Sequence, residues 1–105
     1  MTQYSGVVQY YGLVIFTPNY ATEYKSNIYL EGPDFGTARL WFVPEGGHLG
    51  QNKKYPKQNQ FDIYYWMSSW PHFTELLRNH KPVRFLYDDS DNTAQIRSLD
   101  EPPGG

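Results

Sequence analysis

Residues 27 to 43 read NIYLEGPDFGTARLWFV, and this stretch decides the fold. Its two ends, residues 27 to 31 and 37 to 43, are rich in β-branched and aromatic side chains, which favour strands. The five residues between them, Gly32-Pro33-Asp34-Phe35-Gly36, have the glycine and proline content of a turn. We therefore predict a β-hairpin with a longer loop.

The chain before this hairpin predicts one long strand. Residues 6 to 16 are rich in Val, Tyr, Leu and Ile and are interrupted by Gly12. A lone glycine inside a strand often marks a bulge or a tight bend, which a strongly curved sheet needs at its corners. Because Pro18 has no backbone N–H to donate, we expect the strand to end at Thr17-Pro18-Asn19.

The chain after the hairpin predicts a loop, a helix and three strands. Residues 44 to 60 contain three glycines and few apolar side chains, so we predict a long irregular connection. A short helix at about residues 70 to 79 has apolar residues at helical spacing, and Ser68 and Ser69 are candidates to cap it. The strands are predicted at residues 61 to 67, 83 to 87 and 94 to 99, with a turn at residues 88 to 92 between the last two.

This order of elements predicts a mainly β protein with one short helix. A single helix is too few for a parallel sheet with helices on both faces. We expect a small, mostly antiparallel barrel or a strongly curved sheet, either OB-like or SH3-like. The OB-like alternative is based on the helix that precedes the last two strands, and an antiparallel sheet backed by one helix is a third possibility.

The composition is that of one folded domain. The 105 residues suit a single core, which we place at residues 1 to 100, with residues 101 to 105 as a flexible tail. A net charge of -2 and an aromatic content of 18% favour a folded, aromatic core over disorder. The absence of Cys excludes disulfides and thiol chemistry. Without a membrane-spanning stretch or a signal peptide, we expect a soluble, cytoplasmic protein that does not engage membranes.

Alternation along the predicted strands sorts their side chains onto two faces, because successive residues point in opposite directions. The apolar face is predicted to form the core: Ile28, Leu30, Leu40, Phe42, Phe61, Ile63, Tyr65, Met67, Val83, Phe85 and Ile96. The opposite face combines rings with guanidinium groups: Tyr29, Arg39, Trp41, Tyr64, Trp66 and Arg84. Such a face is either a contact surface or a second core layer beneath the long loop, the helix or another subunit.

As a contact surface, this second face favours protein binding. Tyr, Trp and Arg are the residue types enriched at protein interaction hot spots. We therefore expect a non-catalytic interaction module that contacts a protein partner or a second copy of itself. The alternative is binding of single-stranded nucleic acid or an oligosaccharide on an OB-like aromatic face, with Lys53, Lys54, Tyr55 and Lys57 as a basic arm. The net charge of -2 favours the protein partner.

No pattern in the sequence predicts a metal site, a cofactor or catalysis. His48, His72 and His80 do not have the spacing of paired metal ligands. Asp89 and Asp91 match a calcium loop only in part, because Ala94 stands where that loop needs Gly; a hairpin turn explains them better. No serine or carboxylate pattern indicates an enzyme.

Overall fold

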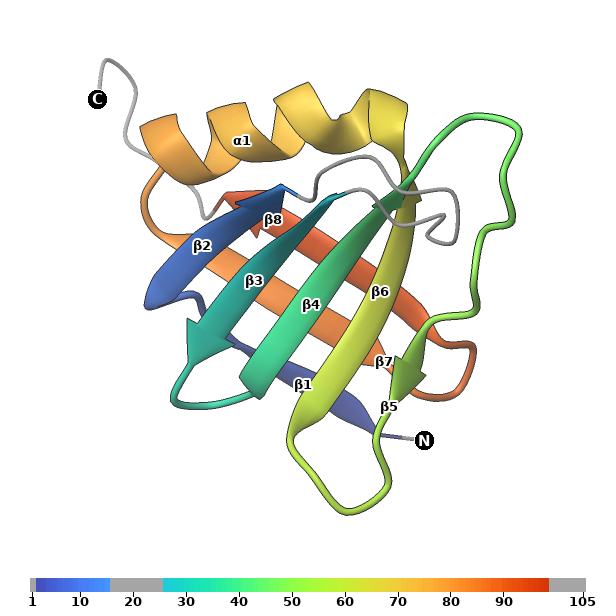
Figure 1. The fold of residues 1–105 in the computed structure, drawn as a ribbon. Helices are drawn as coiled ribbons and strands as arrows, with labels where there is room; N and C mark the ends of the chain where they lie inside the picture. Colours follow the sequence, from blue (N-terminus) through green and yellow to red (C-terminus); the bar gives the residue numbers. More distant parts are fainter. Residues whose placement is uncertain (1, 16–25, 99–105) are drawn as a thin grey trace.

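The strands form two sheets, in a computed structural model that describes residues 2–15 and 26–98 (Figure 1). Their orders are β2-β3-β4-β6-β5 and β1-β7-β8. The larger sheet contains β2 (Tyr10–Ile15), β3 (Ser26–Gly32), β4 (Gly36–Val43), β5 (Lys53–Lys54) and β6 (Gln60–Trp66). The smaller sheet contains β1 (Gln3–Val7), β7 (Val83–Asp88) and β8 (Thr93–Ser98). A 3-10 turn (Met67–Ser69) and helix α1 (Trp70–Asn79) connect β6 to β7.

The pairs of described strands are antiparallel with one exception. Strands β4 and β6 run parallel, from Thr37 opposite Gln60 to Val43 opposite Trp66. The long connection after β4 makes this possible, because a parallel pair cannot be joined by a tight hairpin. A mainly β fold with one short helix is thus confirmed. The described strands form two separate sheets, so the predicted barrel, OB-like or SH3-like, is not confirmed.

The prediction of one long strand over residues 6 to 16 is wrong. The backbone N–H of Val8 donates to the carbonyl of Val83 in the smaller sheet, whereas that of Gln9 donates to the carbonyl of Glu31 in the larger sheet. The chain therefore passes from one sheet to the other at this point and forms two strands. Gly12 marks neither a bulge nor a bend, because the pairing of β2 with β3 continues through it in regular register. The predicted end at residues 17 to 19 lies outside the described residues.

The predicted hairpin and the other strands are confirmed within a few residues, with one addition. Strand β5 lies inside the connection predicted to be irregular and pairs with β6 through Lys53 opposite Asp62. The helix occupies residues 70 to 79 as expected, but its capping differs. Ser69 is the residue before the helix, and its side chain makes no capping hydrogen bond. The predicted tail, residues 101 to 105, lies outside the described residues.

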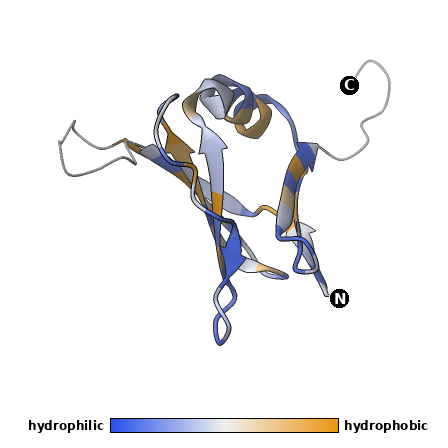
Figure 2. Ribbon diagram, turned by 90° about the vertical axis from the view of Figure 1, so that its right-hand side faces the viewer, coloured by the Kyte–Doolittle hydropathy of each residue, from blue (hydrophilic) through white to orange (hydrophobic). Residues whose placement is uncertain are grey.

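The core lies between the two sheets and is closed at one end by α1 (Figure 2). All the side chains predicted to form the core are buried in it or packed against it. Phe42 joins the larger sheet to the helix, since its ring lies 4.9 Å from that of Trp70 and 5.6 Å from that of Phe73. Tyr65 packs on the ring of Phe42, and burial raises the pKa of Tyr65 to about 12. Phe35 and Tyr87, which were not predicted, are also buried.

Candidate interaction surface

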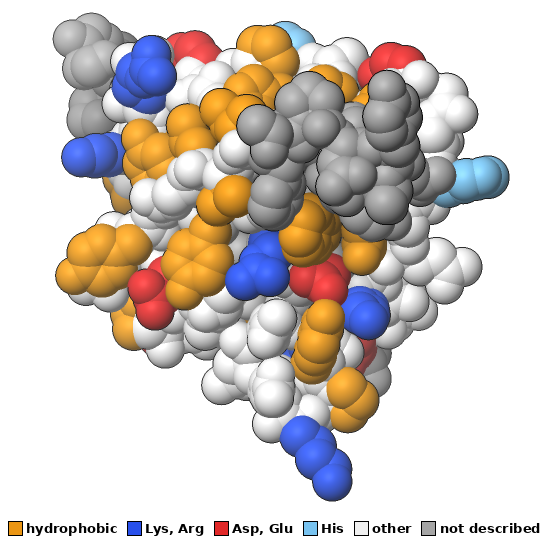
Figure 3. Space-filling view, viewed as in Figure 1, with side chains coloured by type: hydrophobic (Ala, Val, Ile, Leu, Met, Phe, Trp, Pro, Cys, Tyr) orange, Lys and Arg blue, Asp and Glu red, His pale blue; other side chains and the backbone are white. Residues whose placement is uncertain are grey.

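Five of the six residues predicted for the second face lie together on the outer side of the larger sheet. Their strand neighbours Ile28, Leu40 and Ile63 point into the core, so alternation turns the five outward. We call this group the aromatic–Arg face: Tyr29, Arg39, Trp41, Tyr64 and Trp66. All five are partly exposed. Figure 3 looks onto this side and shows hydrophobic side chains around basic and acidic groups near the middle of the view.

Asp62 organises the middle of the aromatic–Arg face. Its side chain is only 6% exposed. Trp41 Nε1 donates to Asp62 Oδ1 at 3.3 Å, and the Tyr55 hydroxyl donates to Asp62 Oδ2 at 2.7 Å. The pKa of Tyr55 is raised, and the hydrogen bond to Asp62 is the largest cause of this shift. Asp62 therefore holds an indole on β4 and a loop tyrosine against one carboxylate, a role that we did not predict, although alternation places it on this face.

Arg39 places a positive charge beside these rings. Its guanidinium carbon lies 5.7 Å from the centre of the Trp41 ring. Asp62 is its register neighbour on β6, yet within the described part of the chain no carboxylate forms a salt bridge with Arg39. A guanidinium that lies over an aromatic ring can still bind a carboxylate or a phosphate.

The long connection covers one end of the face. Val43 points to the same side as Trp41 but is completely buried, and a Cβ on Gly47 would lie 3.1 Å from its side chain. A Cβ on Gly50 would lie 2.9 Å from the ring of Tyr64, so this loop backbone packs directly on that ring. At this end the second face is a covered layer, whereas Tyr29, Arg39 and Trp41 are each partly exposed.

The predicted basic arm divides between two sides of the sheet. Lys53 Nζ lies 4.7 Å from the centre of the Tyr55 ring, next to the aromatic–Arg face. Lys54 instead lies over the ring of Tyr4, a core residue, and donates to the backbone carbonyls of Tyr55 and Gln58. Lys57 is exposed at the loop tip. Lys54 is therefore a structural residue and not part of a common charged surface.

Arg84 does not join the other five residues. It lies on β7 in the smaller sheet, where Val83 and Phe85 on either side point into the core. Its register neighbour is Arg97 on β8. Arg84 thus faces outward from a different sheet, because alternation predicts which face of a strand a residue takes but not which sheet the strand joins.

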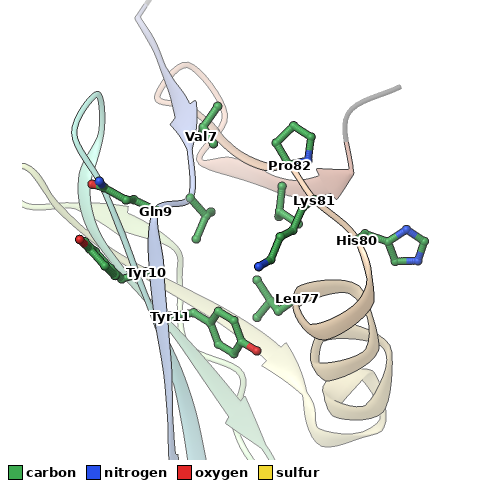
Figure 4. Close-up of a pocket in the computed structure, with 10 residues that line it drawn as sticks. Val7, Gln9, Tyr10, Tyr11, Leu77, His80, Lys81 and Pro82 are labelled. Atoms are coloured by element: carbon green, nitrogen blue, oxygen red, sulfur yellow. The ribbon is translucent and has the colours of Figure 1, made fainter. Parts of the chain in front are cut away.

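A second surface feature was not predicted: an exposed apolar edge beside a cleft. Strand β2 is an edge of the larger sheet, and Tyr10 and Ile15 are 61% and 72% exposed. The cleft next to it has a volume of about 600 Å³ and lies between β2, the end of α1 and the start of β7. Figure 4 shows that Tyr11, Leu77 and Lys81 point toward one another across this cleft.

The acidic turn between β7 and β8 is explained by its own hydrogen bonds. Asp88 Oδ1 accepts from the backbone and hydroxyl of Ser90, and Asp91 Oδ1 accepts from the backbone and hydroxyl of Thr93. Asn92 takes a left-handed conformation with φ 57°, which suits such a turn. Within residues 2–15 and 26–98 there is no group of three metal-ligating side chains.

Replacing Asp62 with Ala should lower the free energy of unfolding by about 1–3 kcal/mol, because two donors lose their acceptor in a largely buried place. Chemical denaturation followed by tryptophan fluorescence measures this change. Asp62→Asn is the matched control; it keeps one acceptor oxygen and should lose less. Equal stabilities of the alanine variant and the wild type would show that the carboxylate does not hold Trp41 and Tyr55.

Among the described residues, no helix is long and apolar enough to cross a membrane. No protein-family model, curated protein or solved structure matches this chain.

Proposed function

We propose that this protein is a small, non-catalytic interaction module that contacts a protein through its aromatic–Arg face. The observation that carries the proposal is the arrangement around Arg39, whose guanidinium lies over the Trp41 ring and forms no salt bridge among the described residues. Trp, Tyr and Arg are the residue types that contribute most to binding energy in protein interfaces. The partner is another protein or a second copy of the chain.

Asp62 supports a protein partner over nucleic acid. Its carboxylate lies between Trp41 and Tyr55, the two rings on which bases would stack, and the acid would repel phosphates. The division of the lysines also weakens the case for a phosphate-binding arm, since Lys54 is tied to carbonyls. Binding to a protein, in contrast, does not require an excess of basic charge on this chain.

Binding of single-stranded nucleic acid or an oligosaccharide remains the second candidate function. The ligand would stack on the rings of the aromatic–Arg face, as ligands of OB-like domains do. Two cation–ring pairs favour it: Arg39 on Trp41 and Lys53 on Tyr55. Base stacking contributes about 1–3 kcal/mol per base, so even two rings would give measurable affinity. This binding would weaken as the salt concentration rises.

Replacing Trp41 with Ala tests the proposal. Because the ring is partly exposed and lies outside the core, we expect cooperative unfolding to persist, with a loss of stability of about 1–3 kcal/mol from the lost packing and hydrogen bond. Wild-type protein should bind neither an oligothymidylate nor a neutral oligosaccharide at low or high salt, measured by calorimetry. Gln95→Ala, at an exposed position of the smaller sheet, is the control.

Two results would contradict the proposal. Loss of cooperative unfolding in the Trp41 variant would make the ring a core residue. Salt-dependent oligonucleotide binding that disappears with Trp41→Ala, and weakens with Lys53→Ala and Lys57→Ala, would establish the second candidate function instead.

A further inference from the structure

The β2 edge lacks the features that normally prevent edge strands from pairing. Natural edges are protected by charged residues, prolines, bulges or very short strands. Strand β5 has only two residues, both lysines, and β8 carries Arg97 among exposed polar side chains. Strand β2 reads YYGLVI, without charge or proline, and five of its six residues are between 40% and 72% exposed. No described strand pairs with its outer edge.

No contact among the described residues explains Gly12, in the middle of β2. A glycine inside a strand weakens it and typically marks a bulge, a bend or the close approach of another backbone. The register is regular at Gly12, and its φ is not positive. A Cβ placed there would meet nothing within 4 Å. The open space at Gly12 leaves room for another backbone to approach closely.

We propose that the β2 edge binds a second copy of this chain. The two β2 strands pair antiparallel about a twofold axis at Gly12, which joins the two larger sheets into one continuous sheet. This contact lies at the β2 edge and does not use the aromatic–Arg face, so the inference goes beyond the proposed function. The aromatic–Arg faces of both copies then lie on the same side of the joined sheet.

The symmetry restricts the register of this pairing. A twofold axis perpendicular to the sheet keeps outward-facing residues opposite outward-facing residues, so the axis must pass through a residue and not between two. Centred on Gly12, the register places Tyr10 opposite Val14 of the second copy and Tyr11 opposite Leu13 of the second copy. Aromatic rings opposite aliphatic side chains are favourable cross-strand pairs. The two glycines meet at the axis, where the backbones come close.

The cleft beside β2 has the place and lining to receive side chains from the second copy. Tyr11 is one of its lining residues, together with Val8, Leu77 and Val83. Leu13 of the second copy, opposite Tyr11, would therefore enter the cleft, and Leu13 is 42% exposed in one copy. A contact between two short strands is small for a stable dimer. Filling both clefts adds the apolar burial that strand pairing alone lacks.

A second copy fits this edge better than a charged partner segment. Strand β2 has no charge, so two copies meet without repulsion between like charges. Each of the four exposed apolar residues around Gly12 gains an apolar residue of the other copy opposite it. These are Tyr10, Tyr11, Leu13 and Val14. Such a self-complementary patch is what a twofold interface requires.

Disulfide cross-linking tests the register directly, because the chain has no cysteine. In the proposed dimer the Cα atoms of the two Gly12 residues lie about 4.5–5.5 Å apart, within the range that a disulfide spans. Gly12→Cys should therefore form a covalent dimer on mild oxidation. Val14→Cys is the control, because its two copies would lie about 13 Å apart along the strands. Cross-linking of Val14→Cys or Leu13→Cys but not of Gly12→Cys would overturn the register.

The molar mass in solution tests the dimer itself. Light scattering of the full chain over a tenfold concentration range, at low and high salt, should give up to twice the 12.3 kDa of one chain. Val14→Lys should reduce this mass to that of a monomer, since each lysine would remove the apolar residue opposite Tyr10 and place on the edge a charge of the kind that prevents edge strands from pairing. Gln95→Lys, which adds the same charge to the exposed edge strand β8, should leave it unchanged.

The outcomes separate this inference from the proposed function. A mass that falls with Val14→Lys and not with Trp41→Ala assigns the contact to the β2 edge. A mass that falls with Trp41→Ala and not with Val14→Lys overturns the inference and supports contact through the aromatic–Arg face. A monomer at every concentration, with no Gly12→Cys cross-link, overturns the inference, and the oligonucleotide and unfolding experiments then judge the proposed function alone.

Discussion

Replacing Phe61 with Ala is expected to remove about 3–5 kcal/mol from the free energy of unfolding, a large part of the total stability of a small domain. Phe61 is completely buried on β6. Its ring lies 5.1 Å from those of Phe85 and Tyr87 on β7, and 5.6 Å from that of Tyr4 on β1. One side chain thus holds the larger sheet against the smaller one. Urea unfolding measures the loss.

Phe61→Leu is the matched control for this prediction. Leucine keeps most of the apolar volume, so it should lose less stability than alanine. Because the ring packs on β1 and β7 of the smaller sheet, we also expect the Phe61→Ala variant to expose the Tyr87 side chain. A loss below about 1 kcal/mol in the alanine variant would show that the sheets are held together elsewhere.

Replacing Gly36 with Ala should cost about 3 kcal/mol, from two sources. Gly36 has φ 92°, a conformation that costs other residues about 1–2 kcal/mol. Its Cβ would also overlap the backbone carbonyl oxygen of Asn59, which accepts a hydrogen bond of 2.9 Å from the Thr37 N–H. Relieving that overlap disturbs the start of the β4–β6 pair, which adds about 1–3 kcal/mol.

Gly46 separates the two sources of this cost. It has nearly the same φ, 90°, but a Cβ there would meet nothing within 4 Å. Gly46→Ala should therefore cost only the backbone strain, about 1–2 kcal/mol. Thermal unfolding of both variants gives the comparison. Equal losses would mean that the contact with Asn59 relaxes without cost and that strain alone requires glycine at position 36.

Local patterns predicted the strands and their faces well. The alternation from Asn27 to Glu31 and from Thr37 to Val43 placed Ile28 and Leu40 in the core and Tyr29, Arg39 and Trp41 on the opposite side, as the structure shows. The helix after Met67 was also predicted, because its apolar spacing is local. These features depend on residues close together in the sequence, where side-chain direction follows from backbone geometry.

Contacts between distant residues could not be predicted in this way. The hydrogen bond from Tyr55 to Asp62 depends on the loop folding back over β6, and no local pattern indicates that. The passage of the chain from one sheet to the other at Val8 and Gln9 could not be predicted for the same reason. A strand that continues and a strand that changes sheets have the same apolar composition, and only the carbonyls of Val83 and Glu31 distinguish them.

The sequence by itself determined most of the strands, which residues are apolar on one side, and that rings and guanidinium groups gather on the other. It did not separate β1 from β2, and it did not indicate β5. Only the tertiary structure decided that Arg84 belongs to a different sheet, that the long connection covers Tyr64, and that β2 is an open edge beside a cleft. The physical reason is that hydrophobic alternation specifies a direction for each side chain, whereas neighbours, edges and cover arise from strand pairing between segments far apart in the chain.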